Sequence, residues 1–366
     1  MLKSRVTNSI LFLVPYPEGR APSQRFRFEQ YFNALEKASY EYQVSSFLDH
    51  KVMSVLYDEG HTLIKVLAVA KGIIRRTADI FRAIRYDIVF IHRETTPIGP
   101  PLFEWILAKI LKKKIIYDFD DAIWISNSSS SNSSLTPFKW NTKVKWICRW
   151  SWKVSCGNKY LQQFALRVNQ HAFINPTTID TQFLHNRLKS HQQSVFTIGW
   201  TGTHSTIRYL AILENLFQRL EKEYEFILLV IGDKRPTLNL GSLRFVPWSK
   251  KTEIEDLLKI DVGIMPLRND AWAKGKCGFK ALQYMALGIP AIVSDVGVNS
   301  EIVDHNIDGW VCRTEEEWEI ILRNLLDRKI DLASYSLAAR RKIELKYSVT
   351  SNTPNFLHLF ANEKVD

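Results

Sequence analysis

Three lysines cluster at the expected start of a helix in the second half of the chain. Lys274, Lys276 and Lys280 precede or open an apolar run that predicts a helix over 279–287. Cations at a helix start oppose the helix dipole by roughly a few tenths of a kcal/mol each, and a bound anion would remove that penalty. A solvated helix start is the structural alternative. We expect Lys276 and Lys280 to contact a phosphate.

A glycine turn could bring backbone N–H groups to the same anion. Gly202 and Thr203 follow an apolar run at an expected strand-to-helix turn. Such a turn exposes N–H groups and the positive end of the helix dipole to a phosphate. This pair is therefore a second candidate phosphate contact.

Basic and polar residues also follow two apolar runs in the first half of the chain. They are Arg20, Ser23, Arg25, His92 and Arg93. The first three lie in a Gly- and Pro-rich turn, 18–27, in which Ser23 is the expected N-cap of a short helix. Arginines suit anionic ligands. For His92 and Arg93, a satisfied structural cluster is the alternative.

The elements that must position these residues form an alternating series. The 366 residues, of which 46% are hydrophobic and 24% charged, predict two globular domains. Short Ile- and Val-rich runs alternate with helix-length stretches, which indicates parallel sheets. In the first half these runs are 9–15, 87–92 and 114–118; in the second half they are 196–199, 226–232, 243–246, 262–265 and 291–294.

Two doubly wound units follow from this rhythm, with the boundary expected in the polar stretch 186–194. Ligands of such sheets bind beyond the carboxyl ends of the strands, so two facing units would enclose one cleft. The stretch 126–134, nearly all Ser and Asn, predicts a flexible loop, either a lid or a plain surface loop.

Several classes of protein are excluded. Neither a GxGxxG nor a GxxxxGK[ST] fingerprint is present, which argues against a dehydrogenase or a P-loop ATPase. The four cysteines and nine histidines show no metal-ligand spacing. No run approaches the roughly 18 apolar residues of a membrane span. The start of the chain resembles a signal peptide, but we expect residues 10–14 to form a buried strand in a cytoplasmic protein.

The positive charge is concentrated in the first half. Residues 1–190 contain 27 Lys and Arg against 15 Asp and Glu, a net +12, whereas residues 191–366 contain 22 against 23, a net −1. The segment 138–153 adds Trp140, Trp146, Trp150 and Trp152 among its cations. Indole rings mixed with cations suit an anionic membrane surface. Core packing of an amphipathic helix is the alternative, and no recognisable module supports nucleic-acid binding.

Five segments between residues 175 and 303 resemble, in order and spacing, the retaining glycosyltransferases of the GT-B fold, and in particular glycosyltransferase family 4. They are 175–180 with Phe183; 199–203; 231–233; 261–267; and 275–290 with 296–297 and 301–303. The resemblance implies an α/β GT-B fold, with two Rossmann-like doubly wound domains facing across a cleft. Residues 1–190 would bind the acceptor, residues 191–348 the nucleotide sugar, and a C-terminal helix over 349–366 would pack back toward the first domain.

The resemblance also assigns roles to single residues. The donor-binding residues would be Gly202, Thr203, Gly232, Lys276, Gly278, Phe279, Gln283 and Glu301. Two family glutamates are missing, because this chain has Gly275 and Gln283 at their positions. Gln283 can still accept a hydrogen bond from a ribose hydroxyl through its amide oxygen. Lys276 and Lys280 resemble replacement cations for basic residues that the family places in the first loop of its donor domain.

The acidic sequence Asp118-Phe119-Asp120-Asp121 admits three interpretations. It matches the Asp-x-Asp metal site of GT-A glycosyltransferases, in which carboxylates hold Mg²⁺ or Mn²⁺ on the diphosphate. In a GT-B frame, Asp120 or Asp121 would instead orient the acceptor hydroxyl. Asp121 could also simply cap the next helix. We expect the GT-B interpretation, with Asp120, Asp121 and Lys280 in the catalytic centre and with no metal or other cofactor.

The expected function is transfer of a sugar from a nucleoside diphosphate sugar to a hydroxyl acceptor, with retention of configuration. The acceptor would be lipid-linked or a polysaccharide, and the enzyme would act in the cytoplasm at the inner face of the membrane. Two alternatives remain open at this point: a sugar-nucleotide epimerase or hydrolase of the same fold, and a catalytically weakened binding protein.

Overall fold

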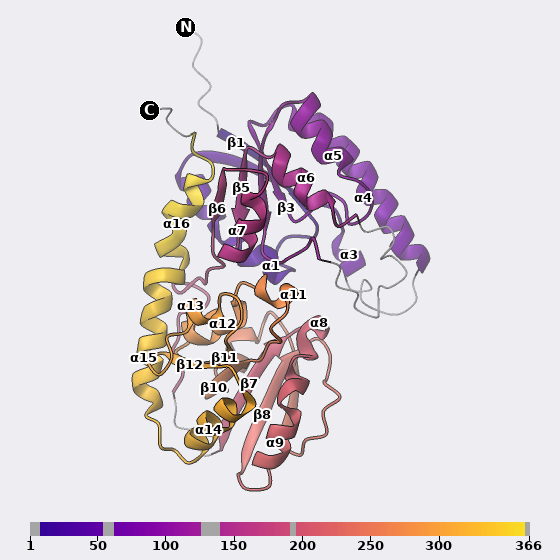
Figure 1. Cartoon of the computed structure of the whole chain (residues 1–366). Helices are drawn as coiled ribbons and strands as arrows, with labels where there is room; N and C mark the ends of the chain where they lie inside the picture. Colours follow the sequence, from indigo (N-terminus) through magenta and orange to yellow (C-terminus); the bar gives the residue numbers. More distant parts are fainter. Residues whose placement is uncertain (1–7, 54–61, 126–139, 191–194, 363–366) are drawn as a thin grey trace. The chain divides into compact units, whose positions relative to one another are not determined.

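The computed structural model describes residues 8–53, 62–125, 140–190 and 195–362. The chain divides into two compact units, the first formed by Met1–Thr177 with Thr353–Asp366 and the second by Thr178–Asn352 (Figure 1). The Ser- and Asn-rich stretch 126–134, for which we predicted a loop, lies outside the described residues.

The first unit contains a six-stranded sheet in the order β2-β1-β3-β4-β5-β6, and every pair of neighbours is parallel. The strands are β1 (Asn8–Val14), β2 (Tyr40–Ser46), β3 (Ile88–His92), β4 (Lys114–Phe119), β5 (Lys153–Cys156) and β6 (Ala172–Ile174). The predicted runs correspond to β1, β3 and β4, and the expected strand near the start of the chain is confirmed as β1. All five residues of β3 are buried, as expected for a central strand covered on both faces.

Short helices and one long helix surround this sheet. They are α1 (Pro22–Arg25), η1 (Glu29–Tyr31), α2 (Phe32–Lys37), α3 (His50–Met53), α4 (Thr62–Ala83), α5 (Leu102–Trp105), η2 (Ile106–Ile110), α6 (Lys143–Trp150) and α7 (Lys159–Leu166). Phe12 of β1 packs against the rings of Phe28, Phe32 and Phe90, so the core next to β1 is largely aromatic. Within the described part of the chain, no helix combines the length and the apolar character that crossing a bilayer requires.

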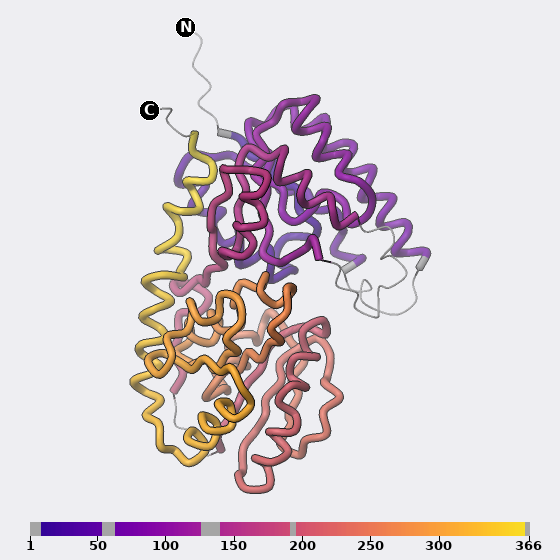
Figure 2. Tube along the Cα trace, viewed as in Figure 1, coloured from indigo at the N-terminus to yellow at the C-terminus, as the bar shows by residue number. Residues whose placement is uncertain are grey.

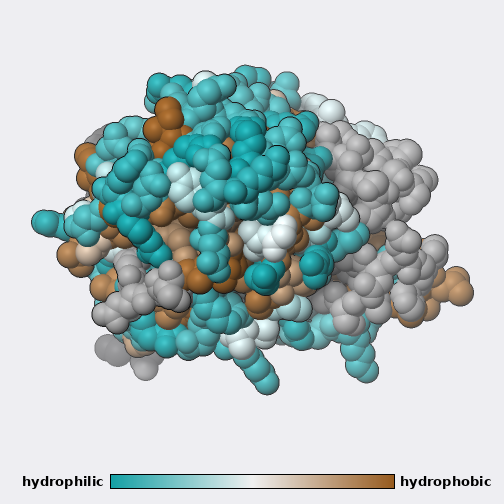
Figure 3. Space-filling model, turned by 90° about the horizontal axis from the view of Figure 1, so that it is seen from below, coloured by the Kyte–Doolittle hydropathy of each residue, from teal (hydrophilic) through white to brown (hydrophobic). Residues whose placement is uncertain are grey.

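The second unit repeats the architecture with the strand order β12-β11-β10-β7-β8-β9, again parallel throughout. Its strands are β7 (Phe196–Gly202), β8 (Phe226–Gly232), β9 (Leu243–Pro247), β10 (Val262–Met265), β11 (Ala291–Ser294) and β12 (Gly309–Cys312). The prediction of two doubly wound α/β units is therefore confirmed. The surface seen in Figure 3 is mainly hydrophilic, with hydrophobic residues showing in small groups.

The helices of the second unit connect and cover these strands. They are α8 (His204–Ile207), η4 (Leu210–Leu213), α9 (Glu214–Leu220), α10 (Glu253–Leu257), α11 (Ala271–Lys274), α12 (Phe279–Ala286), α13 (Asn299–Ile302), α14 (Glu315–Leu326), α15 (Leu332–Lys342), η5 (Ile343–Tyr347) and the first residues of α16 (Val349–His358). Helix α12 contacts β10 and β11, which places its first turn at the carboxyl ends of the central strands.

The division between the units falls before residue 178, ahead of the polar stretch 186–194 in which we expected it. Residues after Thr177 already belong to the second unit, because hydrogen bonds and an ion pair join them to it. The amide of Ile179 donates to the carbonyl of Tyr347 over 2.9 Å. The buried ammonium group of Lys189 lies 3.1 Å from the carboxylate of Asp261. A polar composition alone did not reveal these two anchors.

The chain returns to the first unit at Thr353 (Figure 2, yellow segment). The ring of Phe356 stacks on that of Tyr31 with centroids 4.3 Å apart. The ammonium group of Lys153, in β5, donates to the carbonyl oxygens of His358 and Ala361 over 3.0 and 2.9 Å. The last described turns are thus part of the first unit's core.

Candidate functional site

A charged cluster lies at the carboxyl ends of β3 and β4 in the first unit. His92 and Asp118 are partners in the register of these two strands, so the residues that follow them emerge side by side. The guanidinium of Arg93 donates to Asp120 Oδ1 and to Asp121 Oδ2, each over 2.9 Å. Burial disfavours the charged form of Arg93, but the two carboxylates outweigh it and raise the pKa of Arg93. The predicted residues Arg93, Asp120 and Asp121 therefore form one half-buried group.

The backbone of Arg93 has an unusual conformation at this point. Its φ of 60° lies in the left-handed region, which costs a residue with a side chain about 1–3 kcal/mol. Two hydrogen bonds hold it: the amide of Arg93 donates to the carbonyl of Asp118 over 2.7 Å, and the Tyr117 hydroxyl donates to the carbonyl of Arg93 over 2.6 Å. The geometry of the cluster is thus fixed by the two strands and does not depend on side-chain packing alone.

Asp118 has a different role from Asp120 and Asp121. Its buried carboxylate pairs with Arg27, accepts from the Ser155 hydroxyl over 2.5 Å and lies 2.8 Å from His92 Nδ1. Burial raises the pKa of Asp118, but Arg27 and His92 outweigh that effect and hold it well below the usual value. Sequence reasoning missed this network, in which Asp118 connects three strands and the segment after β1.

His92 does not lie where we expected it. We placed it at the acceptor site, but its side chain is fully buried, and among the described residues its Nε2 has no hydrogen-bond partner. The reason is the bond from Nδ1 to Asp118, which turns the imidazole into the core against the ring of Phe28. His92 is therefore inaccessible to solvent, whereas the Arg93 side chain is partly exposed.

The turn after β1 is built differently from the prediction. Helix α1 begins at Pro22, with Ala21 at the N-cap, so Ser23 is not the cap that we expected. Gln24 and Glu29 organise the turn instead, because Glu29 accepts from the amide of Gly19 over 2.9 Å and from the Gln24 side chain over 3.0 Å. Burial, only partly offset by these bonds, raises the pKa of Glu29.

The two predicted arginines of this turn differ in exposure. Arg20 is exposed, and its Nε donates to His50 Nδ1 over 3.3 Å. Arg25 is buried, with its guanidinium 4.9 Å from the centre of the Phe26 ring. Arg20 is therefore the better placed of the two to meet an anion from solvent.

In the second unit, the glycines that end β7 and β8 lie side by side. Gly202 and Gly232 are register partners, and a Cβ on Gly232 would lie 2.9 Å from the carbonyl oxygen of Gly202. Thr203 caps α8 through a capping box with Thr206. His204 joins the two strand ends, because its Nδ1 lies 2.7 Å from Asp233 Oδ2. Sequence reasoning did not anticipate the pairing of His204 with Asp233.

The predicted phosphate lysines lie over indole rings. Lys280 Nζ lies 5.3 Å from the centre of the Trp200 ring, and Lys276 Nζ lies 5.3 Å from that of Trp272. A Cβ on Gly202 would contact the same Trp200 ring. The fold thus brings Lys280 and the Gly202 turn together around Trp200, although they are 78 residues apart in the sequence.

A second glycine turn precedes α12. Gly278, its N-cap, has a φ of 67°, and a Cβ at this position would lie 2.0 Å from Ile302 Cδ1. This close approach packs the start of α12, with Phe279, against α13, which carries the predicted donor residue Glu301. Only glycine combines the left-handed backbone with such an approach.

Gln283 has a partner that the sequence did not reveal. Its side chain is buried, and its amide nitrogen donates to Glu253 Oε1 over 3.3 Å. The same carboxylate oxygen accepts from Trp248 Nε1 over 3.2 Å. Because the amide nitrogen faces Glu253, the amide oxygen is the atom that can accept from a ligand hydroxyl.

The comparisons with known proteins agree with this architecture. Residues 195–328 match the family model described as "Glycosyl transferases group 1". A search of curated proteins finds no significant match.

Solved structures match the whole fold at low sequence identity. A glycosyltransferase from Rickettsia africae ESF-5 has a TM-score of 0.66 at 16% identity, covering 97% of this chain and 98% of that one. Starch synthase IV from Arabidopsis thaliana, bound to ADP and acarbose, has 0.67 at 11%, covering 97% and 99%. HepE from Anabaena, in complex with UDP-glucose, has 0.62 at 14%, covering 96% and 98%. The expected GT-B fold is thereby confirmed.

Proposed function

Since the second unit of this protein carries a glycosyltransferase group 1 domain, we propose that the protein transfers a sugar from a nucleoside diphosphate sugar to a hydroxyl acceptor with retention of configuration, as a family 4 enzyme. A nucleotide donor is supported by two structurally similar proteins, since HepE is in complex with UDP-glucose and starch synthase IV is bound to ADP. The second unit binds this donor, and the first unit presents the acceptor.

The juxtaposition of Lys280 with the Gly202 turn carries the proposal. Both lie near Trp200, at the carboxyl end of the central strand β7, and ligands of doubly wound sheets bind outside such strand ends. The ammonium group and the N–H groups of the turn face the diphosphate. As the bond to the sugar breaks, negative charge collects on the departing diphosphate, and fixed cations stabilise that charge most strongly in the transition state. Lys276 supplies a second cation for the diphosphate.

The acceptor hydroxyl is oriented by the cluster of Arg93, Asp120 and Asp121. One guanidinium shared by two carboxylates leaves a net negative group that can accept a hydrogen bond from a hydroxyl. No protein nucleophile and no metal takes part in the proposed reaction, and positioning of the two reactants lowers the barrier. Chelation tests the metal-free proposal: activity survives excess EDTA, whereas loss with rescue by Mn²⁺ would return Asp120 and Asp121 to a metal site.

We also propose that the enzyme works at the inner membrane face, in the synthesis of a cell-surface polysaccharide or glycolipid. The first half carries the excess positive charge, and α6 places Trp146 on its exposed side, 5.9 Å from the ring of Trp150 and 5.8 Å from the guanidinium of Arg149. The buried face of α6 consists of other residues, chiefly Val144 and Ile147. Trp146 is thus available to a headgroup interface.

A thermal-shift panel of nucleoside diphosphate sugars tests donor binding. A donor at 100 times its Kd stabilises the fold by about 2.7 kcal/mol. We expect at least one donor to raise the Tm of the wild type, a smaller shift for Lys280→Ala, and an unchanged shift for the control Lys329→Ala, whose side chain is exposed and paired with Asp327. No shift with any nucleotide sugar would contradict the proposal.

A further inference from the structure

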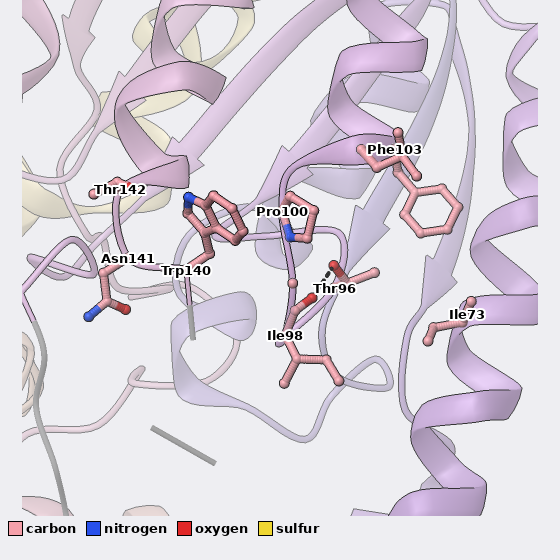
Figure 4. A pocket seen from close by; sticks show the side chains of 10 residues that line it. Ile73, Thr96, Ile98, Pro100, Phe103, Trp140, Asn141 and Thr142 are labelled. Carbon is pink, nitrogen blue, oxygen red and sulfur yellow. Dashed lines mark hydrogen bonds between the residues drawn. The ribbon is translucent and has the colours of Figure 1, made fainter. Parts of the chain in front are cut away.

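A cavity of about 870 Å³ lies in the first unit. Three stretches of chain line it: Ile73 from α4, residues 96–103 before and within α5, and residues 140–142 before α6. Figure 4 shows the side chains of Ile73, Ile98, Phe103 and Trp140 around it. This volume lies within the roughly 300–1,000 Å³ that is typical of ligand sites.

The lining selects for an apolar occupant. None of the described residues that line the cavity is charged. The Thr96 hydroxyl donates to the carbonyl of Ile98 over 3.0 Å and is thereby satisfied within the wall (Figure 4). Nearby, the buried ammonium group of Lys143 is held by Glu94 Oε2 and by the carbonyl of Thr96, each over 2.7 Å. The wall thus offers mainly aliphatic and aromatic surface, and Asn141 and Thr142 are its further polar residues.

Apolar side chains are exposed at the cavity and on the helix that contributes Ile73 to its wall. Leu102 is 53% and Trp140 52% exposed, and Val66, on α4, is 58% exposed. A contiguous patch of exposed apolar side chains often marks an interaction site. The same helix carries Lys71, which is mostly exposed. Exposed apolar side chains interspersed with cations are found at bilayer interfaces.

The cavity is also close to the proposed acceptor cluster. Thr96 follows Arg93 by three residues, so their Cα atoms are at most about 11 Å apart. Glu94, which lies between them, is fixed to the cavity wall through Lys143. A molecule whose chain fills the cavity can therefore present its polar end near Arg93.

We infer that this cavity holds the aliphatic chain of an amphiphilic acceptor, whose hydroxyl-bearing end lies at the cluster of Arg93, Asp120 and Asp121. The inference rests on the proposed function and makes its acceptor a lipid. The positive charge of the first half and the apolar faces next to the cavity suit an amphiphile that arrives from an anionic bilayer.

Binding of dansylundecanoic acid, a fluorescent aliphatic chain, tests the inference without a donor or a turnover. We expect saturable binding to the wild type and displacement by long-chain alcohols. Ile73→Glu places a carboxylate in the cavity wall and weakens binding at least about tenfold, because an unpaired charge is costly in apolar surroundings. The matched control is Ile74→Glu, on the same helix and one residue further, which does not line the cavity and changes the Kd by less than about twofold.

Ile98→Trp is a second variant, which fills the cavity without adding a charge and is expected to reduce binding as well. Absence of saturable binding to the wild type would overturn the inference, as would equal weakening by Ile73→Glu and Ile74→Glu, which would indicate adsorption to the surface of α4. The donor panel separates the two proposals: probe binding with no response to any nucleotide sugar contradicts the proposed function, whereas the reverse result contradicts only the lipid acceptor.

Discussion

Arg27 and Asp118 form an ion pair in which both side chains are almost completely buried, with exposed fractions of 1% and 0%. The pair joins the segment after β1 to the end of β4, and Arg27 also donates to the carbonyl of Asn175 just after β6. A buried charge is costly unless it is paired. The carboxyl end of the first sheet, which carries the cluster of Arg93, Asp120 and Asp121, therefore depends on this pair for its stability.

Asp118→Asn tests this dependence. The variant leaves the Arg27 cation buried without its counter-charge, and we expect a loss of about 3–5 kcal/mol in the free energy of unfolding, measured with urea. The control is Asp295→Asn, which removes an ion pair with Arg313, whose side chain is 73% exposed, and costs less than about 1 kcal/mol. Equal losses in the two variants would show that burial of the pair does not matter.

The same carboxylate predicts a dependence on pH. Because the folded pKa of Asp118 lies below its unfolded value of about 3.9, its contribution is complete above that pH and is lost as the pH falls toward the folded pKa. The free energy of unfolding of the wild type should therefore fall more steeply below about pH 5 than that of Asp118→Asn. Parallel curves for the two proteins would contradict this assignment.

The contact between Gln283 and Glu253 explains why a glutamate is not used at position 283. In Gln283→Glu, two buried carboxylates would face each other, so that one of them must be protonated or repelled. We expect a loss of about 1–3 kcal/mol in the free energy of unfolding at pH 7.

Adding Glu253→Gln to that variant restores an amide-to-carboxylate pair with its direction reversed. We expect the double variant to be more stable than the sum of the two single changes predicts, as a double-mutant cycle measures. An additive cycle would mean that the two side chains do not interact.

Kinetics of Lys276→Ala and Lys280→Ala test the proposed phosphate contacts. A charge-assisted contact of about 1.5–3 kcal/mol corresponds to a ten- to hundredfold loss in kcat/KM. We expect Lys280→Ala to act mainly on kcat, since the β-phosphate gains charge in the transition state, and Lys276→Ala to act mainly on the KM for the donor. Wild-type kinetics in both variants would leave these lysines as surface cations.

Most of the strands that the sequence revealed have buried side chains on both faces, and β9 is an exception because only its Leu243 is buried. In the runs 114–118 and 262–265 every residue except Lys114 is buried, and such burial favours apolar residues such as Ile115, Ile116, Val262 and Ile264. Strand β2 was missed since it lies at the sheet edge and half of its residues are polar. Strand β5 was missed because it contains Lys153, whose burial depends on carbonyl groups more than 200 residues away.

The candidate site was predictable to a similar extent. Glycine turns and lysines can be located from local sequence, because backbone conformation and helix position are local properties. The partners of charged groups are not local. Nothing near Asp118 in the sequence indicates Arg27, and nothing near Gln283 indicates Glu253, so Asp118 was grouped with Asp120 and Gln283 was read without its neighbour. Tertiary contacts alone distinguish a buried structural carboxylate from an accessible one.

The C-terminal return to the first unit has a consequence for synthesis of the chain. Phe356 and Phe360, 0% and 3% exposed, pack on Tyr31 and Phe90, which are made long before them. After Tyr31 and Phe90, and before Phe356 and Phe360, the ribosome must synthesise the whole of Thr178–Asn352. This takes about 9–35 s at roughly 5–20 residues per second. Throughout that interval the nascent first unit exposes the aromatic surface that its last helix will cover, and this surface is accessible to chaperones.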